Sequence, residues 1–191
     1  MSGSRGAAAA GVTGQGGLCI RNADESDMAA IQAIYAWHVK HGLGSFEEAA
    51  PGVAEMTRRW RGVTDNGLPW LVATRDGEVT GYCYAGYYHP RSAWRFCLED
   101  SVYVSRHAQG QGVGSALLGA LIERCEAGPW RQLVALVGDR DNAGSIALHE
   151  RFGFTRCGVL EGVGFKFDRW VDVVVMQRPL GAGQKAPPGA E

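Results

Sequence analysis

A glycine-rich run late in the chain is the part of this sequence that most directly predicts chemistry. It reads Gln109-Gly110-Gln111-Gly112-Val113-Gly114-Ser115 and stands between a strand pattern and an amphipathic helix pattern. Glycines let successive backbone N–H groups turn toward one point, and the first turn of the following helix adds a partial positive charge. The run therefore predicts an anion site whose natural guest is a pyrophosphate. A tight turn without a ligand is the alternative.

Two common phosphate-binding loops do not fit this run. A P-loop ends in Gly-Lys-Ser or Gly-Lys-Thr, and the run contains no lysine. The dinucleotide fingerprint Gly-x-Gly-x-x-Gly, begun at Gly110, needs its third glycine where Ser115 stands. That fingerprint also opens a βαβ unit, whereas a hairpin pattern precedes this loop.

The elements that must position the loop follow a mixed α/β (α+β) order. Apolar or alternating stretches predict strands at residues 18–21, 70–74, 79–84, 94–104, 133–137, 154–160 and 171–177. Helical spacing predicts helices after Asp24, over residues 53–63, after Gly112 and from Asn142. Asp76-Gly77 joins two of the strands and is a strong hairpin signal.

The composition predicts one globular domain over residues 17–180. A chain of 191 residues with 46% hydrophobic residues is long enough to bury one core. Small, flexible residues predict a disordered leader at 1–16 and a disordered tail at 181–191.

The net charge of -1, without a basic block, argues against nucleic acid or an anionic membrane as the binding partner. No apolar stretch reaches the length of a membrane span, so a small molecule is the expected partner.

The five cysteines stand singly, with neither metal-ligand nor redox-pair spacing. The sequence therefore predicts no metal site. Isolated thiols also favour reduced cysteines in a cytoplasmic protein.

The spacing Gln-x-x-Gly-x-Gly, after a strand ending Val102-Tyr103-Val104, resembles the acetyl-CoA loop of the GNAT superfamily of N-acetyltransferases. Asn142, followed by a helix that ends in Gly153-Phe154, is similar to the second signature of that superfamily. The strings at residues 99–104 and 164–170 resemble the phosphinothricin and methionine sulfoximine acetyltransferase branch. The resemblance covers about residues 20–179.

The resemblance implies a GNAT fold, with a mixed, twisted central sheet flanked by helices. Its strands four and five splay into a V that holds the pantetheine of acetyl-CoA, which pairs with the backbone of one strand as an added strand would. The implied cofactor-binding residues are Val102, Tyr103, Val104, Gly110, Gln111, Gly112, Val113, Gly114, Ser115, Asn142 and Arg151. The implied reaction is direct acetyl transfer in a ternary complex.

Acetyl transfer requires a base for the amine, a donor for the oxyanion and a proton for the leaving thiolate. A backbone N–H near Val104 is the expected oxyanion donor. Glu99 is the expected base, directly or through a water; an exposed strand carboxylate or a structural ion pair is the alternative. His149 matches a residue proposed to act in catalysis in the phosphinothricin branch, and a structural histidine is its alternative.

The general acid is left open by the sequence. Many superfamily members use a tyrosine near the second signature to protonate the thiolate, whereas Phe152 and Phe154 stand in that neighbourhood here. Water is the alternative proton source.

The resemblance places the substrate between a turn and the strand before the loop. The implied substrate-binding residues are His89, Pro90, Arg91, Glu99, Asp100 and Ser101. Arg91 or Arg95 is suited to clamp a carboxylate bidentately; a solvated surface charge is the alternative. The roles of Lys166 and Trp170 are not derivable from the sequence.

The expected activity is N-acetylation of the α-amino group of an amino acid or glutamate analogue such as phosphinothricin or methionine sulfoximine. The resemblance also implies a homodimer and resistance to such analogues. The sequence does not fix which amino acid is used. A protein N-terminal or polyamine acetyltransferase, which predicts a long groove or an acidic pocket, and a non-catalytic acyl-CoA sensor remain the alternatives.

Overall fold

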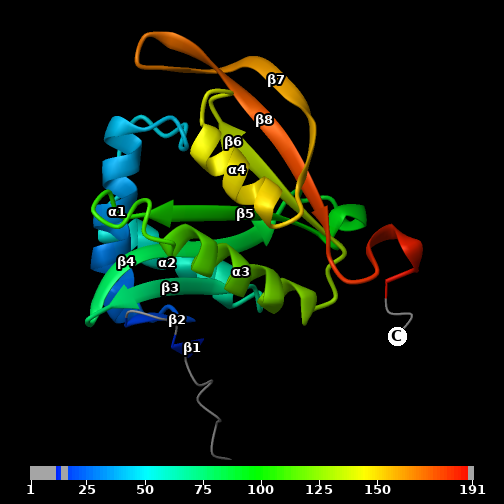
Figure 1. Cartoon of the computed structure of the whole chain (residues 1–191), viewed down its shortest axis with the longest axis horizontal. Coiled ribbons are helices and arrows are strands. Elements are labelled where there is room, and N and C mark those ends of the chain that lie inside the picture. Colours follow the sequence, from blue (N-terminus) through cyan, green and yellow to red (C-terminus); the bar gives the residue numbers. More distant parts are fainter. Residues whose placement is uncertain (1–11, 14–16, 189–191) are drawn as a thin grey trace, which may run out of the picture.

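The computed structural model describes residues 12–13 and 17–188, so most of the expected leader lies outside the described residues. Its strands form one mixed sheet in the order β1-β2-β3-β4-β5-β6-β8-β7 (Figure 1). The strands are β1 (Val12–Thr13), β2 (Leu18–Asn22), β3 (Trp70–Arg75), β4 (Glu78–Tyr87), β5 (Cys97–Val104), β6 (Gln132–Gly138), β7 (Thr155–Lys166) and β8 (Arg169–Pro179). The α-helices are α1 (Met28–His41), α2 (Val53–Thr64), α3 (Val113–Glu126) and α4 (Ala143–Arg151). Short 3-10 helices are η1 (Glu25–Asp27), η2 (Ser92–Trp94) and η3 (Gly183–Lys185).

The sheet has a core on each face. Helix α3 packs on β3, β4 and β5, and α4 packs on β6, around the fully buried Leu98, Leu117 and Leu133. Helices α1 and α2 cover the other face, around Met28 and Tyr82. The expected fold class is confirmed. Among the described residues, no helix has the length and apolarity to cross a membrane.

Most expected strands and helices differ from the structure by a few residues at their ends, and three of the differences have a structural cause. The strand expected from residue 94 begins at Cys97, because Ser92–Trp94 turn into η2. Strand β7 runs to Lys166, beyond the expected 160; it is an outer strand that pairs with β8 across two register shifts, so it lacks a regular apolar alternation. Ordered backbone also continues past residue 180 into η3, where Gly183 is buried, so the tail expected to be disordered from 181 begins with structure.

The feature that creates the site is the divergence of β5 and β6. These parallel strands pair from Cys97↔Gln132 to Glu99↔Val134, although β5 continues to Val104. On their outer sides β5 pairs with β4 along its length and β6 pairs with β8 along its length. Each strand is therefore held in place by its outer neighbour while the gap between β5 and β6 widens. If the two-residue β1 is not counted, β5 and β6 are strands four and five, so this gap is the expected splay.

Candidate active site

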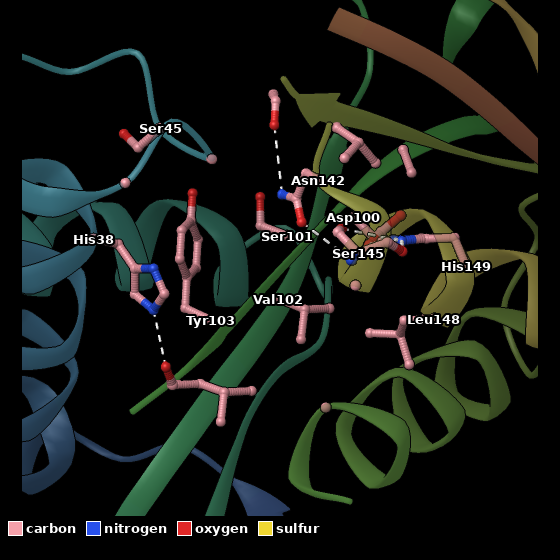
Figure 2. Close-up of a pocket in the computed structure, with 18 of the residues that line it drawn as sticks. His38, Ser45, Asp100, Ser101, Val102, Tyr103, Asn142, Ser145, Leu148 and His149 are labelled. Atoms are coloured by element: carbon pink, nitrogen blue, oxygen red, sulfur yellow. Dashed lines mark hydrogen bonds and ion pairs between the residues drawn. The ribbon is translucent and has the colours of Figure 1, made fainter. Parts of the chain in front are cut away.

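A cleft of about 1340 Å³ opens where β5 and β6 separate (Figure 2). Its walls come from the end of α1 and the loop after it, from β5 and the glycine run, and from β6 and α4. The sequence predicted the walls formed by β5 with the glycine run and by α4, and the structure adds the wall formed by α1.

Beyond Glu99, the backbone of β5 presents to this cleft an edge that pairs with no other strand. Ser105 N donates to Thr80 O at 2.9 Å, which fixes the phase of the antiparallel ladder between β4 and β5. In that phase the N–H and C=O groups of Val102 and Val104 turn away from β4, toward the cleft. Tyr103 directs its backbone to β4 instead and contributes its ring to the cleft wall. An extended chain that carries amides can therefore pair with Val102 and Val104 as an added strand.

The glycine run continues from this edge as an anion site. Gly110 (φ 72°) and Gly112 (φ 81°) are left-handed, a conformation that disfavours any side chain, and Gly112 is the N-cap of α3. Because Gly112 has no side chain, it cannot accept hydrogen bonds from the first N–H groups of α3. These N–H groups therefore remain available to a ligand. Arg151 Nη1 donates to Ser115 Oγ at 3.4 Å and brings a cation to the same end of the cleft. These residues fit the pyrophosphate of acetyl-CoA.

Two residues of the run, Gln111 and Val113, are not among those that line the cleft. Val113 is 1% exposed and packs in the core, and the Gln111 side chain is held outside the cleft by Arg75 and the His107 carbonyl. On the opposite wall Asn142 caps α4, accepting from Ser145 N at 3.2 Å. Its amide also donates to Gly138 O at 3.4 Å, so Asn142 ties the end of β6 to the start of α4.

Glu99 lies at the narrow end of the cleft, where β5 and β6 part. Its carboxylate is half-buried, and burial first, then the charge of Asp100, raise its pKa above the ordinary glutamate value. A carboxylate with a raised pKa is a better proton acceptor, as the predicted base requires.

Asp100 points to the opposite face of β5 and contacts α4. Asp100 Oδ2 lies 3.1 Å from His149 Nε2, and His149 Nδ1 lies 2.7 Å from the Ser145 carbonyl (Figure 2). Burial alone would lower the pKa of His149, but the hydrogen bond to Asp100 and its charge, with the Ser145 carbonyl, raise it. The side chains of Asp100 and His149 thus form a buried pair with each other, and Asp100, His149 and Ser101 all line the cleft.

The expected substrate turn lies elsewhere. His89, Pro90 and Arg91 follow β4 on the surface, outside the residues that line the cleft. His89 Nδ1 accepts from Arg91 N at 3.2 Å, and the His89 ring packs beside Trp94, so the turn is closed on itself. Arg95 donates to Ser92 O at 3.0 Å and lies over the Phe96 ring. Neither arginine reaches the cleft of this chain as a carboxylate clamp.

The structure adds His38 to the predicted site residues. Its Nε2 donates to Val104 O at 2.9 Å from the last turns of α1, across the open edge of β5 (Figure 2). Burial lowers the pKa of His38, with a smaller opposing effect of the Val104 carbonyl, so the ring is a neutral donor there. Only the packing of α1 against β5 reveals this contact, because the two residues are 66 positions apart.

Lys166 holds the loop that forms the α1 wall. Its Nζ donates to Gly42 O at 3.0 Å and to Ser45 O at 2.6 Å, and the residue is 4% exposed. The loop also sits so close to β6 that a Cβ at Gly138 would lie 2.1 Å from Leu43 O. Burial lowers the pKa of Lys166. The role that the sequence left open for Lys166 is therefore to anchor this wall.

A network of tyrosine and charged groups completes that wall. Tyr35 Oη lies 2.8 Å from Ser45 Oγ and 2.9 Å from Glu47 Oε1, and Arg59 Nη1 donates to the same Glu47 oxygen at 2.6 Å. Glu47 therefore reaches the cleft already paired with Arg59.

Among the described residues, no group of three or more His, Cys, Asp or Glu side chains is placed to hold a metal ion.

Comparisons with known proteins agree with this geometry. Residues 31–154 match the Acetyltransferase (GNAT) family. The chain is 57% identical to a phosphinothricin N-acetyltransferase of Alcaligenes faecalis over 88% of its own length and 86% of that protein. It is 38% identical to an L-methionine sulfoximine/L-methionine sulfone acetyltransferase of Pseudomonas aeruginosa, over 88% and 98% of the two chains. A phosphinothricin acetyltransferase of Sinorhizobium meliloti, solved with AcCoA, superposes with a TM-score of 0.88 at 41% identity, over 91% and 94% of the chains.

Proposed function

The chain belongs to the GNAT acetyltransferase family, and we propose that it moves the acetyl group of acetyl-CoA to the α-amino group of an amino acid or glutamate analogue, with phosphinothricin and methionine sulfoximine as substrates. The observation that carries this proposal is one continuous cleft. It joins an anion site at Gly110 and Gly112 to the free edge of β5 and ends at the half-buried Glu99.

Binding of the cofactor, removal of a proton from the amine and stabilisation of the oxyanion each have a residue in this cleft. The glycine run and Arg151 hold the pyrophosphate, and the backbone of Val102 and Val104 holds the pantetheine in line with the strand. Glu99 accepts the proton of the substrate ammonium, directly or through a water. A backbone N–H of Val102 or Val104 then donates to the oxyanion as the amine attacks the thioester.

A homodimer is part of the proposal. Strands β7 and β8 form one long hairpin at the edge of the sheet (Figure 1). This hairpin carries a set of exposed apolar side chains. Its members are Val159, Leu160, Val163, Phe165, Phe167 and Trp170. Trp170 is 71% exposed in the single chain, and exposed apolar patches of this kind mark association surfaces.

A cytoplasmic location is also part of the proposal, because the five cysteines are free thiols. Acetylation of a toxic glutamate analogue there would give resistance to it.

A cationic amine is the second candidate substrate. Glu47 and Glu99 line the cleft, whereas Arg91 and Arg95 lie outside it. Although Glu47 is paired with Arg59, this arrangement would also suit a cationic amine such as a polyamine.

Release of the CoA thiol tests both candidates. The purified enzyme is given acetyl-CoA with phosphinothricin, methionine sulfoximine, ordinary amino acids, spermidine or a short peptide, one at a time. Fast release with the two glutamate analogues supports the proposal. Release with spermidine or peptide alone would overturn the substrate class, and acetyl-CoA binding without turnover on any amine would favour a sensor.

A further inference from the structure

The loop between α1 and α2 brings one aromatic side chain to the cleft without burying it. Phe46 lines the cleft and is 42% exposed. Two side chains of β7, Leu160 and Val163, line the same cleft and are exposed as well. Exposed apolar side chains that gather on the lining of a cleft are suited to contact an apolar group of a ligand.

The Phe46 ring lies directly on the backbone of β7. A Cβ at Gly164 would lie 2.0 Å from Phe46 Cε1 and 2.3 Å from Phe46 Cδ1, far inside the contact distance of two carbon atoms. Gly164 has φ outside the left-handed region, so its backbone conformation does not call for glycine. The close approach of the ring is what requires a glycine at this place.

The residues on both sides of Phe46 are fixed too. Lys166 Nζ donates to the carbonyl of Ser45 at 2.6 Å, and Arg59 Nη1 donates to the carboxylate of Glu47 at 2.6 Å. Both donors come from other elements, β7 and α2, so the loop is tied before and after the ring. The fold therefore sets the position of the ring before any ligand arrives, which lowers the entropy cost of binding against it.

The loop wall is the part of the cleft that acetyl-CoA does not need. In the proposed function the glycine run, the edge of β5 and the α4 wall hold the cofactor, which leaves the loop wall to the acceptor. Phosphinothricin and methionine sulfoximine share one group that glutamate lacks. Their side chains end in a methyl group, carried by phosphorus in the first and by sulfur in the second.

We propose that Phe46, with Leu160 and Val163, forms a subsite for this terminal methyl group, and that Phe46 determines which alkyl group fits there. The subsite rests on the proposed function for the identity of the reaction and deepens it, because it names the group by which the enzyme selects these analogues over glutamate. Gly164 is a positioning residue that acts through the Phe46 ring.

A series of alkyl homologues tests the subsite. The sulfoximines of methionine, ethionine and buthionine carry a methyl, an ethyl and a butyl group on the same sulfur. Wild-type kcat/KM is expected to fall from methyl to butyl by about tenfold or more. In Phe46→Ala, kcat/KM for the methyl compound is expected to fall about tenfold and that for the butyl compound to rise, because the alanine leaves room for the longer chain. KM for acetyl-CoA should stay within about twofold of the wild type. Phe46→Leu, which keeps a smaller apolar side chain, should give an intermediate ratio.

A double-mutant cycle tests Gly164. Gly164→Ala is expected to lower kcat/KM for methionine sulfoximine about tenfold, because the ring must leave its place. In the Phe46→Ala background it should cause no further loss, since no ring is left for the new Cβ to meet. Gly158→Ala is the matched control: Gly158 is on the same strand with φ outside the left-handed region, and a Cβ there would meet no described atom within 4 Å beyond its chain neighbours. The control is expected to keep the wild-type kcat/KM.

The outcomes separate the subsite from the reaction. A Phe46→Ala enzyme that keeps the wild-type ratio of butyl to methyl turnover would overturn the subsite. Losses that add up in the double variant would overturn the role of Gly164. A wild type that releases CoA with none of the sulfoximines and not with phosphinothricin would instead overturn the proposed function, a result distinct from an active enzyme with an unchanged ratio.

Discussion

The substitution Gly114→Ala is expected to change the stability of the protein and its affinity for acetyl-CoA in different ways. Gly114 is in the first turn of α3, at the floor of the cleft, with φ outside the left-handed region. A Cβ there would lie 3.4 Å from Leu148 Cδ2 and 3.6 Å from Val104 Cγ2, both ordinary van der Waals contacts. The substitution therefore fits the free protein without a clash and bridges the groove between β5 and α4.

The two expected effects have opposite signs. Replacing a helical glycine by alanine stabilises the fold by about 0.5–1 kcal/mol. For a chain of this length that raises Tm by about 1–4 °C. The added methyl group also occupies space that the pantetheine needs, and overpacking of this kind costs about 1–3 kcal/mol. That cost corresponds to a Kd for acetyl-CoA about 5–150 times higher.

Calorimetric titration with acetyl-CoA and a thermal scan measure both effects on one sample. Gly62→Ala is the matched control, since Gly62 lies in α2, away from the cleft walls, and a Cβ added there would meet no described atom within 4 Å outside its own helix. It is expected to raise Tm by a similar amount and to leave Kd unchanged. A Gly114→Ala protein that binds acetyl-CoA as tightly as the wild type would refute the placement of the cofactor between β5 and α4.

Three further substitutions test separate parts of the site. Glu99→Gln is expected to lower kcat about 100-fold or more without changing the affinity for acetyl-CoA. Because the pKa of Glu99 is raised, the wild-type kcat/KM should rise with pH through a midpoint above 4.5, and a pH profile of the variant that keeps this limb would exclude Glu99 as the base. Lys166→Met removes the donor to the Gly42 and Ser45 carbonyls and should lower the free energy of unfolding by about 1–3 kcal/mol. Its KM for the amine should rise more than its KM for acetyl-CoA; an equal rise in both would argue against a role in the substrate wall. Trp170→Ser should raise the dimer dissociation constant about tenfold or more in light scattering, and an unchanged constant would remove the hairpin as the interface.

The parts of the site that are local in sequence were predictable. Gly110 and Gly112 predict left-handed backbone and the start of α3 from a few neighbouring residues, and Asn142 predicts the N-cap of α4 in the same way. The expected splay of the strands followed from the resemblance to the superfamily and is seen in the short pairing of β5 with β6.

The parts that depend on distant pairs were not predictable from one sequence. Lys166 meets Gly42 across 124 residues, and neither residue type alone signals the contact. Asp100 lines the cleft, as a substrate-binding residue would, but its pairing with His149 on α4, 49 residues away, was not predictable. The turn at His89 and Arg91 is near the site in sequence and yet closes on itself at the surface.

The most direct test of the proposed reaction follows the acetyl carbon itself. Acetyl-CoA labelled with ¹³C at the acetyl carbonyl is mixed with phosphinothricin and the enzyme, and the carbonyl signal is monitored by NMR. The proposed reaction predicts that the thioester signal is replaced by an amide signal in proportion to the CoA thiol released, and that Glu99→Gln slows the exchange. A thioester signal that persists, or that converts to free acetate instead of an amide, would contradict an acetyl transfer to this amine.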